Sequence, residues 1–291
     1  MPRELIAYYQ NGNYVVKQYS DGTKIKQTTS DCFVSAFPDS IDLKITNYCD
    51  QNCPMCHEKS NENGEHADLS APFLKTLKKG TELAIGGGNP LSHQELVPFL
   101  EKMKSQGVIC NLTINENHLE AYNDLVLRLI RKKLIYGLGI SIKAYNKQAV
   151  AFAMGYPNTV LHVINGIFTD YDKIANLNAK ILILGYKMVG RGITYFNDEI
   201  RKQMNITKEI LPSLFNKFRH VSFDNLALEQ LDVKSILSKA DFEQMYMGED
   251  GESTMYIDLV NKEFAKSSTS PDRFLLMDEI NPMFKHIQAQ K

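Results

Sequence analysis

The stretch Ile41-Asp-Leu-Lys-Ile-Thr46 alternates apolar and polar residues and runs directly into Cys49-Asp-Gln-Asn-Cys53-Pro-Met-Cys56. Alternation with a period of two predicts a strand, so three thiols follow the carboxyl end of one strand on a single short loop. Thiolates on such a loop can bind three corners of a cubane iron–sulfur cluster and leave one iron without a protein ligand. An open coordination position is what catalytic metals use to bind substrate.

Two other interpretations of this loop have to be weighed. Cys53 and Cys56 alone form a Cys-x-x-Cys redox pair, but this pair leaves Cys49 without a role. Cys49, Cys53, Cys56 and His57 offer four ligands to a structural zinc ion, although His57 directly follows a ligand and would strain a shared tetrahedron. We therefore prefer the iron–sulfur interpretation, and keep zinc as the alternative.

The composition narrows the class of protein. The 291 residues are 43% hydrophobic and 23% charged, which suits one large domain with appendages or two small ones. Lys plus Arg number 33 and Asp plus Glu 34, so charge does not indicate a nucleic-acid or membrane partner. There is no apolar run of about 18 residues and no secretory segment, so we expect a cytoplasmic protein. The odd number of cysteines in that compartment favours a metal site over disulfides.

Short apolar strands alternate with amphipathic helices over residues 37–230, which predicts parallel strands joined by right-handed crossovers. The expected strands are 41–46, 83–86, 109–114, 138–142, 160–164, 181–186 and 220–223. The expected helices are 71–79, 93–106, 123–133, 147–154, 166–176, 197–205 and 208–218. This α/β pattern predicts a partial (β/α)6-type parallel barrel, with an open doubly wound sheet as the competitor. In both, the chemistry belongs at the carboxyl ends of the strands.

Two flanking segments lack the regular alternation of strands and helices. Residues 1–36 contain three short strand patterns separated by Asn11-Gly12 and Asp21-Gly22, and this predicts an N-terminal antiparallel ribbon packed on the core. Residues 231–291 predict a helix over 234–247 and a hairpin that turns at Asn261-Lys262, which together form a small C-terminal α+β extension. We therefore expect three regions: residues 1–36, 37–230 and 231–291.

The Cys-x3-Cys-x2-Cys spacing after a first strand resembles the radical S-adenosylmethionine (radical SAM) superfamily, over roughly residues 39–230. The resemblance implies one [4Fe–4S] cluster on Cys49, Cys53 and Cys56, with SAM bound to its open iron. It also implies that an external one-electron reductant drives SAM cleavage, and that the resulting 5′-deoxyadenosyl radical abstracts hydrogen from a substrate. The family often has an aromatic residue where this chain has Met55, and a flexible thioether can fill that space.

The resemblance also implies where SAM is held. The second predicted strand ends in Gly86-Gly-Gly-Asn-Pro90, which resembles the family's Gly-Gly-Glu-Pro segment. Backbone carbonyls of Gly87 and Gly88 and the side-chain oxygen of Asn89 are the expected acceptors for the SAM ammonium group. Asn89 stands where the family has glutamate, and a neutral amide is a weaker acceptor for a cation than a carboxylate.

Polar residues at the ends of later strands complete the expected cofactor site. Asn115 ends the third strand and is either a turn starter or a SAM contact. Ser141 and Lys143 share one face of the fourth strand and are expected near the SAM ribose and carboxylate. Lys187 and Arg191 follow the sixth strand and are expected to hold the SAM carboxylate or an anionic substrate group, the other possibility being a solvated loop.

The substrate is not evident from the sequence, and no catalytic residue is assigned. Substrate-side candidates, by position only, are Asp224, Asn225, Glu229 and Gln230; the histidines 66, 93 and 118 are expected mostly at the surface. The leading hypothesis is a radical SAM enzyme acting on a peptide, protein or small molecule. Alternatives are a glycyl-radical-type activase of a partner protein, a non-enzymatic zinc-stapled binding module and an iron–sulfur electron carrier. With no cysteine beyond Cys110, the C-terminal extension has no thiol ligands for a second cluster.

Overall fold

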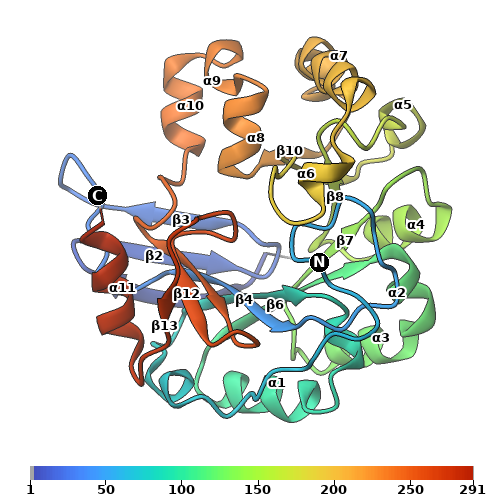
Figure 1. The fold of residues 1–291 in the computed structure, drawn as a ribbon. Coiled ribbons are helices and arrows are strands. Elements are labelled where there is room, and N and C mark those ends of the chain that lie inside the picture. The colour runs from blue at the N-terminus through green and yellow to red at the C-terminus, as the bar shows by residue number, and fades with distance from the viewer. Residues whose placement is uncertain (1–2, 291) are drawn as a thin grey trace.

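Parallel strands in chain order form the main part of the sheet in the computed structural model, which describes residues 3–290 (Figure 1). Each of the seven predicted strands is present with its bounds shifted by no more than a few residues. They are β4 (Ser40–Thr46), β5 (Glu82–Gly87), β6 (Ile109–Asn115), β7 (Gly137–Ser141), β8 (Thr159–Ile164), β9 (Lys180–Leu184) and β10 (His220–Phe223). The predicted α/β class with a mostly parallel sheet is confirmed.

The order of the strands argues against one of the two expected architectures, the doubly wound sheet. The full sheet runs β10-β9-β8-β7-β6-β5-β4-β11-β12-β13, so each crossover from β4 to β10 moves one strand further in the same direction. A doubly wound sheet would reverse its strand order at a switch point, and this sheet does not. The sheet is therefore singly wound, and its two edges, β10 and β13, are not paired with each other.

The helices agree less well with the sequence. The structure has α1 (Leu96–Ser105), α2 (Glu116–Ala121), α3 (Asn123–Arg131), α4 (Lys147–Gly155), α5 (Tyr171–Ile174), α6 (Gly192–Tyr195), α7 (Asp198–Leu214), α8 (Asn225–Gln230), α9 (Val233–Ile236) and α10 (Lys239–Met245). The predicted helix over 71–79 is a 3-10 turn at Pro72–Thr76, and the one over 166–176 shrinks to α5. The predictions over 197–205 and 208–218 merge into α7, which continues through Pro212. No helix of residues 3–290 is long and apolar enough to cross a membrane.

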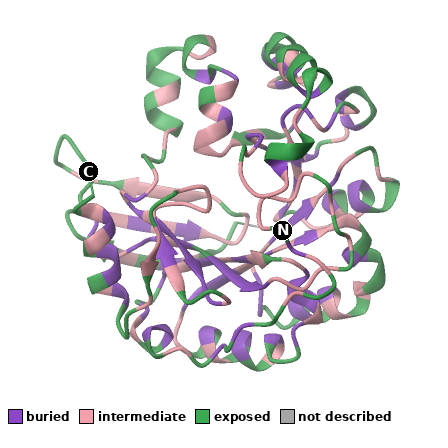
Figure 2. Ribbon diagram, in the orientation of Figure 1, coloured by how far each residue is buried: buried purple, intermediate pink, exposed green. Residues whose placement is uncertain are grey.

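Burial follows the alternation of each strand. On β4, Ile41, Leu43 and Ile45 are at most 1% exposed and pack in the main hydrophobic core. Asp42 and Lys44 lie on the opposite face, which we call the inner face of the sheet. Figure 2 shows buried strands in the middle of the molecule and exposed helical surfaces around them. The sheet thus has an apolar face under the helices and an inner face that carries polar groups.

The N-terminal ribbon is an antiparallel sheet of β1 (Leu5–Asn11), β2 (Tyr14–Tyr19) and β3 (Lys24–Gln27), as predicted. It is tied to the core through Asp39, which precedes β4 and is 1% exposed. The Asp39 carboxylate accepts hydrogen bonds from the Tyr14 hydroxyl at 2.6 Å and from Asn11 Nδ2 at 2.7 Å, and pairs with Lys26 Nζ at 2.8 Å. At the amino ends of the parallel strands, Lys180 Nζ donates to the Asp21 carbonyl. The ribbon therefore packs at the amino ends of the parallel strands.

The C-terminal residues add strands to the main sheet. The predicted hairpin is present as β11 (Thr254–Asp258) and β12 (Glu263–Ala265), followed by β13 (Phe274–Leu275) and α11 (Ile280–Gln288). β11 pairs parallel with β4, directly beside the strand that leads into the cysteines. This pairing was not predicted, because nothing local in either strand specifies a partner more than 200 residues away. The predicted helix over 234–247 is broken into α9 and α10.

Candidate active site

The three clustered cysteines lie on one loop that begins directly after β4. Each thiol is half-buried, and the Cys56 amide donates to the Cys53 carbonyl at 3.1 Å. Burial raises the pKa of the Cys49 thiol, and the nearby charges of Cys53, Asp50 and Cys56 raise it further. The thiols are therefore close enough to repel one another as thiolates. Such a group is stable when a metal centre takes up the negative charge.

The glycine-rich segment after β5 packs directly on the start of this loop. The Gly88 amide donates to the Thr46 carbonyl at 2.8 Å, and the Asn89 amide to the Tyr48 carbonyl at 2.6 Å. A Cβ on Gly88 would lie 2.0 Å from the Tyr48 oxygen, so only glycine allows this approach. By contrast, a Cβ on Gly86 would meet no atom within 4 Å. The segment thus holds the cysteine loop and leaves open space beside it.

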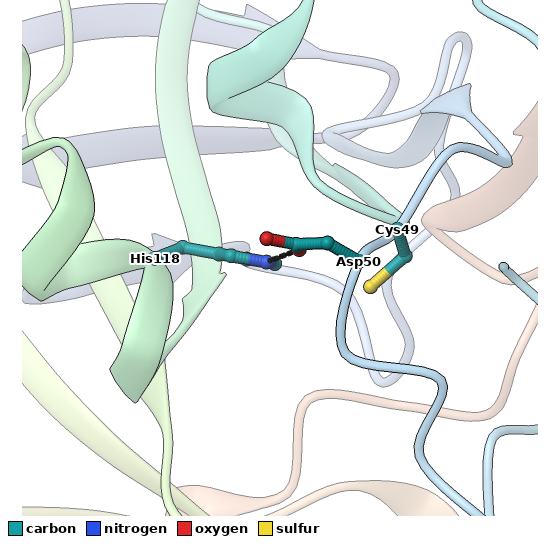
Figure 3. A group of neighbouring side chains, drawn as sticks. All are labelled: Cys49, Asp50 and His118. Atoms are coloured by element: carbon teal, nitrogen blue, oxygen red, sulfur yellow. Dashed lines mark hydrogen bonds and ion pairs between the residues drawn. The ribbon is translucent and has the colours of Figure 1, made fainter. Parts of the chain in front are cut away.

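A buried histidine is hydrogen-bonded to Asp50, the residue that follows the first cysteine (Figure 3). His118 lies on α2, is 1% exposed, and its Nε2 is 2.6 Å from Asp50 Oδ1. The ligand atoms of Cys49, Asp50 and His118 all lie within 4.8 Å of one another. The expectation that the histidines lie mostly at the surface is wrong for His118 and for His93, which is 6% exposed, because each is hydrogen-bonded inside the fold.

Arg191 binds the cysteine loop from the β9 side. Its Nε donates to the Cys53 carbonyl at 3.0 Å, one terminal nitrogen donates to the Ser60 carbonyl at 2.9 Å, and its amide donates to the Cys56 carbonyl at 3.0 Å. A Cβ on the preceding Gly190 would lie 2.2 Å from the His57 carbonyl oxygen. The side chain expected to hold an anion therefore directs two donors at the backbone of the cysteine loop.

Replacing Arg191 with alanine should loosen residues 53–60. Charge-assisted hydrogen bonds contribute more than neutral ones, so we expect the free energy of local opening to fall by about 2 kcal/mol. Hydrogen–deuterium exchange of that segment measures the change. Arg201→Ala is the matched control, because Arg201 is an exposed arginine paired with Asp198 on α7. Unchanged hydrogen–deuterium exchange at 53–60 in Arg191→Ala would show that the Arg191 hydrogen bonds do not stabilise the cysteine loop.

The other residues expected at SAM make these contacts in the protein. Asn89 is 1% exposed, its Oδ1 accepts from the Leu91 amide at 3.2 Å, and its Nδ2 has no partner in residues 3–290. Asn115 Oδ1 accepts from the Asn117 amide and caps α2, the turn-starting role. Ser141 lies opposite Asn115 at the end of β7. Lys143 Nζ is 3.9 Å from Cys53 Sγ, so this lysine reaches the cysteine loop.

Lys187 connects the cysteine loop to the C-terminal extension. Its Nζ donates to Ser268 Oγ at 2.8 Å and lies 3.4 Å from His57 Nε2. A buried charge network runs alongside this contact: Lys44, 4% exposed, pairs with Glu58 at 2.7 Å and with Asp258 at 2.9 Å. This network was not predicted from the sequence. The available signal was Lys44 itself, a lysine at a polar position of the predicted strand 41–46.

Two titratable side chains on the inner face have no hydrogen-bond or ion-pair partner within residues 3–290. Asp42 on β4 is reached by water, but it is surrounded by protein atoms that weaken its hydration. This loss of hydration, together with the charges of Asp250, Asp224 and Glu82, raises its pKa from 3.8 to about 6, while the charge of Lys187 acts in the opposite direction. His162 on β8 lies beside Gly139, and burial lowers its pKa to about 4. Near neutral pH, Asp42 is thus an anion and His162 a neutral imidazole.

Asp42 should give the protein a measurable pH dependence. A carboxyl that is harder to ionise in the folded state leaves the unfolded state with fewer bound protons. The contribution of Asp42 to the free energy of unfolding is therefore fully present below pH 3.8 and is lost as pH rises through about 6. Asp42→Asn should remove this component from unfolding curves measured across that range. Denaturant titrations with the same slope against pH in both proteins would show that Asp42 titrates normally.

The four substrate-side candidates after β10 have mostly structural contacts. Asp224 Oδ1 accepts from the amides of Ala227 and Gly185, each at 2.8 Å, and so caps α8 and ties it to β9. Gln230 Oε1 accepts from the Tyr186 amide at 2.9 Å. Asn225 Nδ2 donates to Asp250 Oδ1 at 2.8 Å. Within residues 3–290, Glu229 takes part through its backbone, since its carbonyl accepts from the Asp232 amide.

Comparison with known proteins gives a similarity of fold. No protein-family model and no curated protein matches the chain. Among solved structures, Streptococcus suis SuiB bound to S-adenosylmethionine matches with a TM-score of 0.52 at 16% identity, over 80% of this chain and 61% of SuiB. SuiB bound to the precursor peptide SuiA matches with 0.49 at 13% identity, over 80% and 60%. The match thus spans about three fifths of the SuiB chain, and over that length this protein shares its fold with the SAM-bound SuiB structure.

Proposed function

We propose that this protein is a radical SAM enzyme with one [4Fe–4S] cluster on Cys49, Cys53 and Cys56. The observation that carries the proposal is the position of the three thiols, on one loop at the carboxyl end of β4, in a fold shared with a SAM-bound protein. In this proposal residues 37–230 are a partial (β/α)6-type barrel, flanked by the ribbon of residues 1–36 and the extension of residues 231–291.

The residues present fit the cofactors in their chemistry. Soft thiolates suit iron–sulfur clusters, and the open space at Gly86 lies beside the segment Gly87, Gly88 and Asn89 proposed to bind SAM. Asn115, Ser141, Lys143, Lys187 and Arg191 are the further proposed contacts. A bound cluster, reduced by an external one-electron donor, would supply the electron for SAM cleavage and so for hydrogen abstraction from a substrate.

The protein's own residues have three tasks in this proposal. Gly88, His118 and Arg191 hold the cysteine loop in place from three different strand ends. Lys143 brings a positive charge to the thiolates, which lowers the cost of the negative charge there. Asp42 and His162, as an anion and a neutral imidazole near neutral pH, orient the polar groups of a substrate on the inner face.

The test is SAM cleavage by the complete chain. Protein reconstituted anaerobically with iron and sulfide, then reduced and given SAM, should produce 5′-deoxyadenosine. A protein that carries a full cluster and yields none would overturn the proposal. A partner-bound radical trapped in such reactions would instead favour the activase alternative.

A second candidate function is the zinc-stapled binding module. It is favoured by the close approach of Cys49, Asp50 and His118, since a thiolate, a carboxylate and an imidazole are all zinc ligands. The expected metal content separates the two candidates. Iron and labile sulfide in anaerobically purified protein support the enzyme, whereas zinc without either supports the binding module.

A further inference from the structure

Strand β10 ends the sheet with an unpaired edge. The Arg219 amide donates to the Ala179 carbonyl at 2.9 Å, and the parallel register continues with Val221 opposite Ile181. Because alternate residues of a strand point their backbone groups to opposite sides, the N–H and C=O groups of His220 and Ser222 point away from β9. No other strand of residues 3–290 pairs with this edge, and both residues are exposed.

A cavity of about 640 Å³ adjoins this edge. Its walls come from both faces of β10, from the ribbon turn at Gly22 and from the chain between Leu237 and Met247. The cavity is therefore bounded by strand β10 and by the segment that contains helix α10. The volume is within the range of sites that bind ligands or peptide segments.

The wall that α10 and Met247 contribute is apolar and largely exposed. Helix α10 contains no buried residue, and Met245 and Met247 are 58% and 52% exposed (Figure 2). Phe242, which also lines the cavity, stacks on Tyr246 and not on the core. A helix that leaves its aromatic and methionine side chains in a cavity presents an adaptable apolar surface to a second molecule.

The cavity is lined by positively charged side chains near the amino end of β10. Lys180 and Arg219 both line it and are close enough to lower the pKa of His220, for which burial is the larger cause. Lys180 Nζ donates to a backbone carbonyl, and Arg219 forms no ion pair within residues 3–290. Asp21 is the carboxylate that offsets them. An occupant with an acidic group at this end would complement the charge.

We propose that the edge of β10 binds an extended acidic peptide as an added strand. Backbone hydrogen bonds to His220 and Ser222 would hold the peptide, α10 would cover its apolar side chains, and Arg219 would pair with its acidic end. Every second side chain of such a strand points to the inner face, where Asp42 and His162 lie. This deepens the proposed function by naming a peptide as the substrate class, and it rests on that function only for what happens after binding.

The test uses the full chain and two fluorescein-labelled octapeptides of alternating valine and threonine. One carries two glutamates at its amino end, the other at its carboxyl end. Fluorescence anisotropy should show saturable binding of at least one, and N-methylation of alternate residues in that peptide should weaken it about tenfold or more, because each methyl removes a backbone donor. Arg219→Gln should weaken binding several-fold, whereas Arg201→Gln, an exposed arginine on α7, should not.

Three results would overturn the proposal. Neither peptide binds; the peptide binds as well with N-methyl groups as without them, whichever set of alternate residues carries them; or Arg219→Gln and Arg201→Gln have the same effect on binding. A stable dimer in light scattering that excludes the peptides would assign the edge to a second copy of the chain instead. Binding is measured without SAM and without reductant. Failure here therefore leaves 5′-deoxyadenosine formation intact, and failure of SAM cleavage leaves peptide binding measurable.

Discussion

Cluster content should fall to background when Cys49, Cys53 or Cys56 is replaced by alanine. Each thiol would hold one corner of the cubane, and a compact loop offers no fourth cysteine as a substitute, because Cys110 is buried in β6 and Cys32 lies in the exposed segment before β4. Iron and labile sulfide, together with the broad visible absorbance of anaerobically reconstituted protein, measure the change.

Cys32→Ala is the matched control for these variants. Cys32 is exposed and takes no part in the loop, so this variant should keep the full content of iron and sulfide. The ligand assignment is wrong if Cys56→Ala also retains a full cluster. Loss of iron from Asp50→Ala or His118→Ala alone, with iron retained in Cys53→Ala and Cys56→Ala, would move the metal to the Cys49–Asp50–His118 group.

Lys44→Met should destabilise the folded protein by about 3 to 5 kcal/mol, because removing one partner of a buried ion pair leaves the other charges uncompensated. Glu58 and Asp258 both pair with Lys44, and the Tyr256 hydroxyl donates to the other Glu58 oxygen at 2.9 Å. Although burial opposes ionisation, these two carboxylates raise the pKa of Lys44, which therefore stays charged at neutral pH. Chemical denaturation measures the loss.

Lys208→Met is the control for Lys44→Met. Lys208 pairs with Asp232 at 3.3 Å, but their side chains are 46% and 52% exposed, and an exposed pair contributes about 0 to 1 kcal/mol. Equal losses in the two variants would mean that the Lys44 network is as well solvated as the surface pair. A larger loss in Lys44→Met would show that this network joins β4, the cysteine loop and β11.

Much of the fold was predictable because strands of a parallel sheet are short, apolar and separated by regular intervals. All seven predicted parallel strands are present, as are the ribbon and the β11–β12 hairpin. Helices were predicted less well, since their ends depend on caps and packing. The Asn197 side chain caps α7, and packing carries that helix through Pro212 into a region read as a second helix.

The candidate site was also predictable only in part. Sequence spacing identified the cysteine loop, because three thiols within eight residues have few other uses. It did not find His118, Asp50 or Lys44, nor the hydrogen bonds that Arg191 donates to the Cys53 and Ser60 carbonyls. A polar residue at a strand end has the same appearance in sequence whether it holds a ligand or a neighbouring loop.

The sequence by itself determined which strands form and which side of each strand is apolar, since these depend on residues close together along the chain. The tertiary structure decided which strands are neighbours, so that β11 lies beside β4 and β10 is left as a free edge. It also decided the partners of the buried charges, as Lys44 meets Asp258 from 214 positions away. Contacts between such distant residues depend on the packing of the whole chain, which local sequence does not specify.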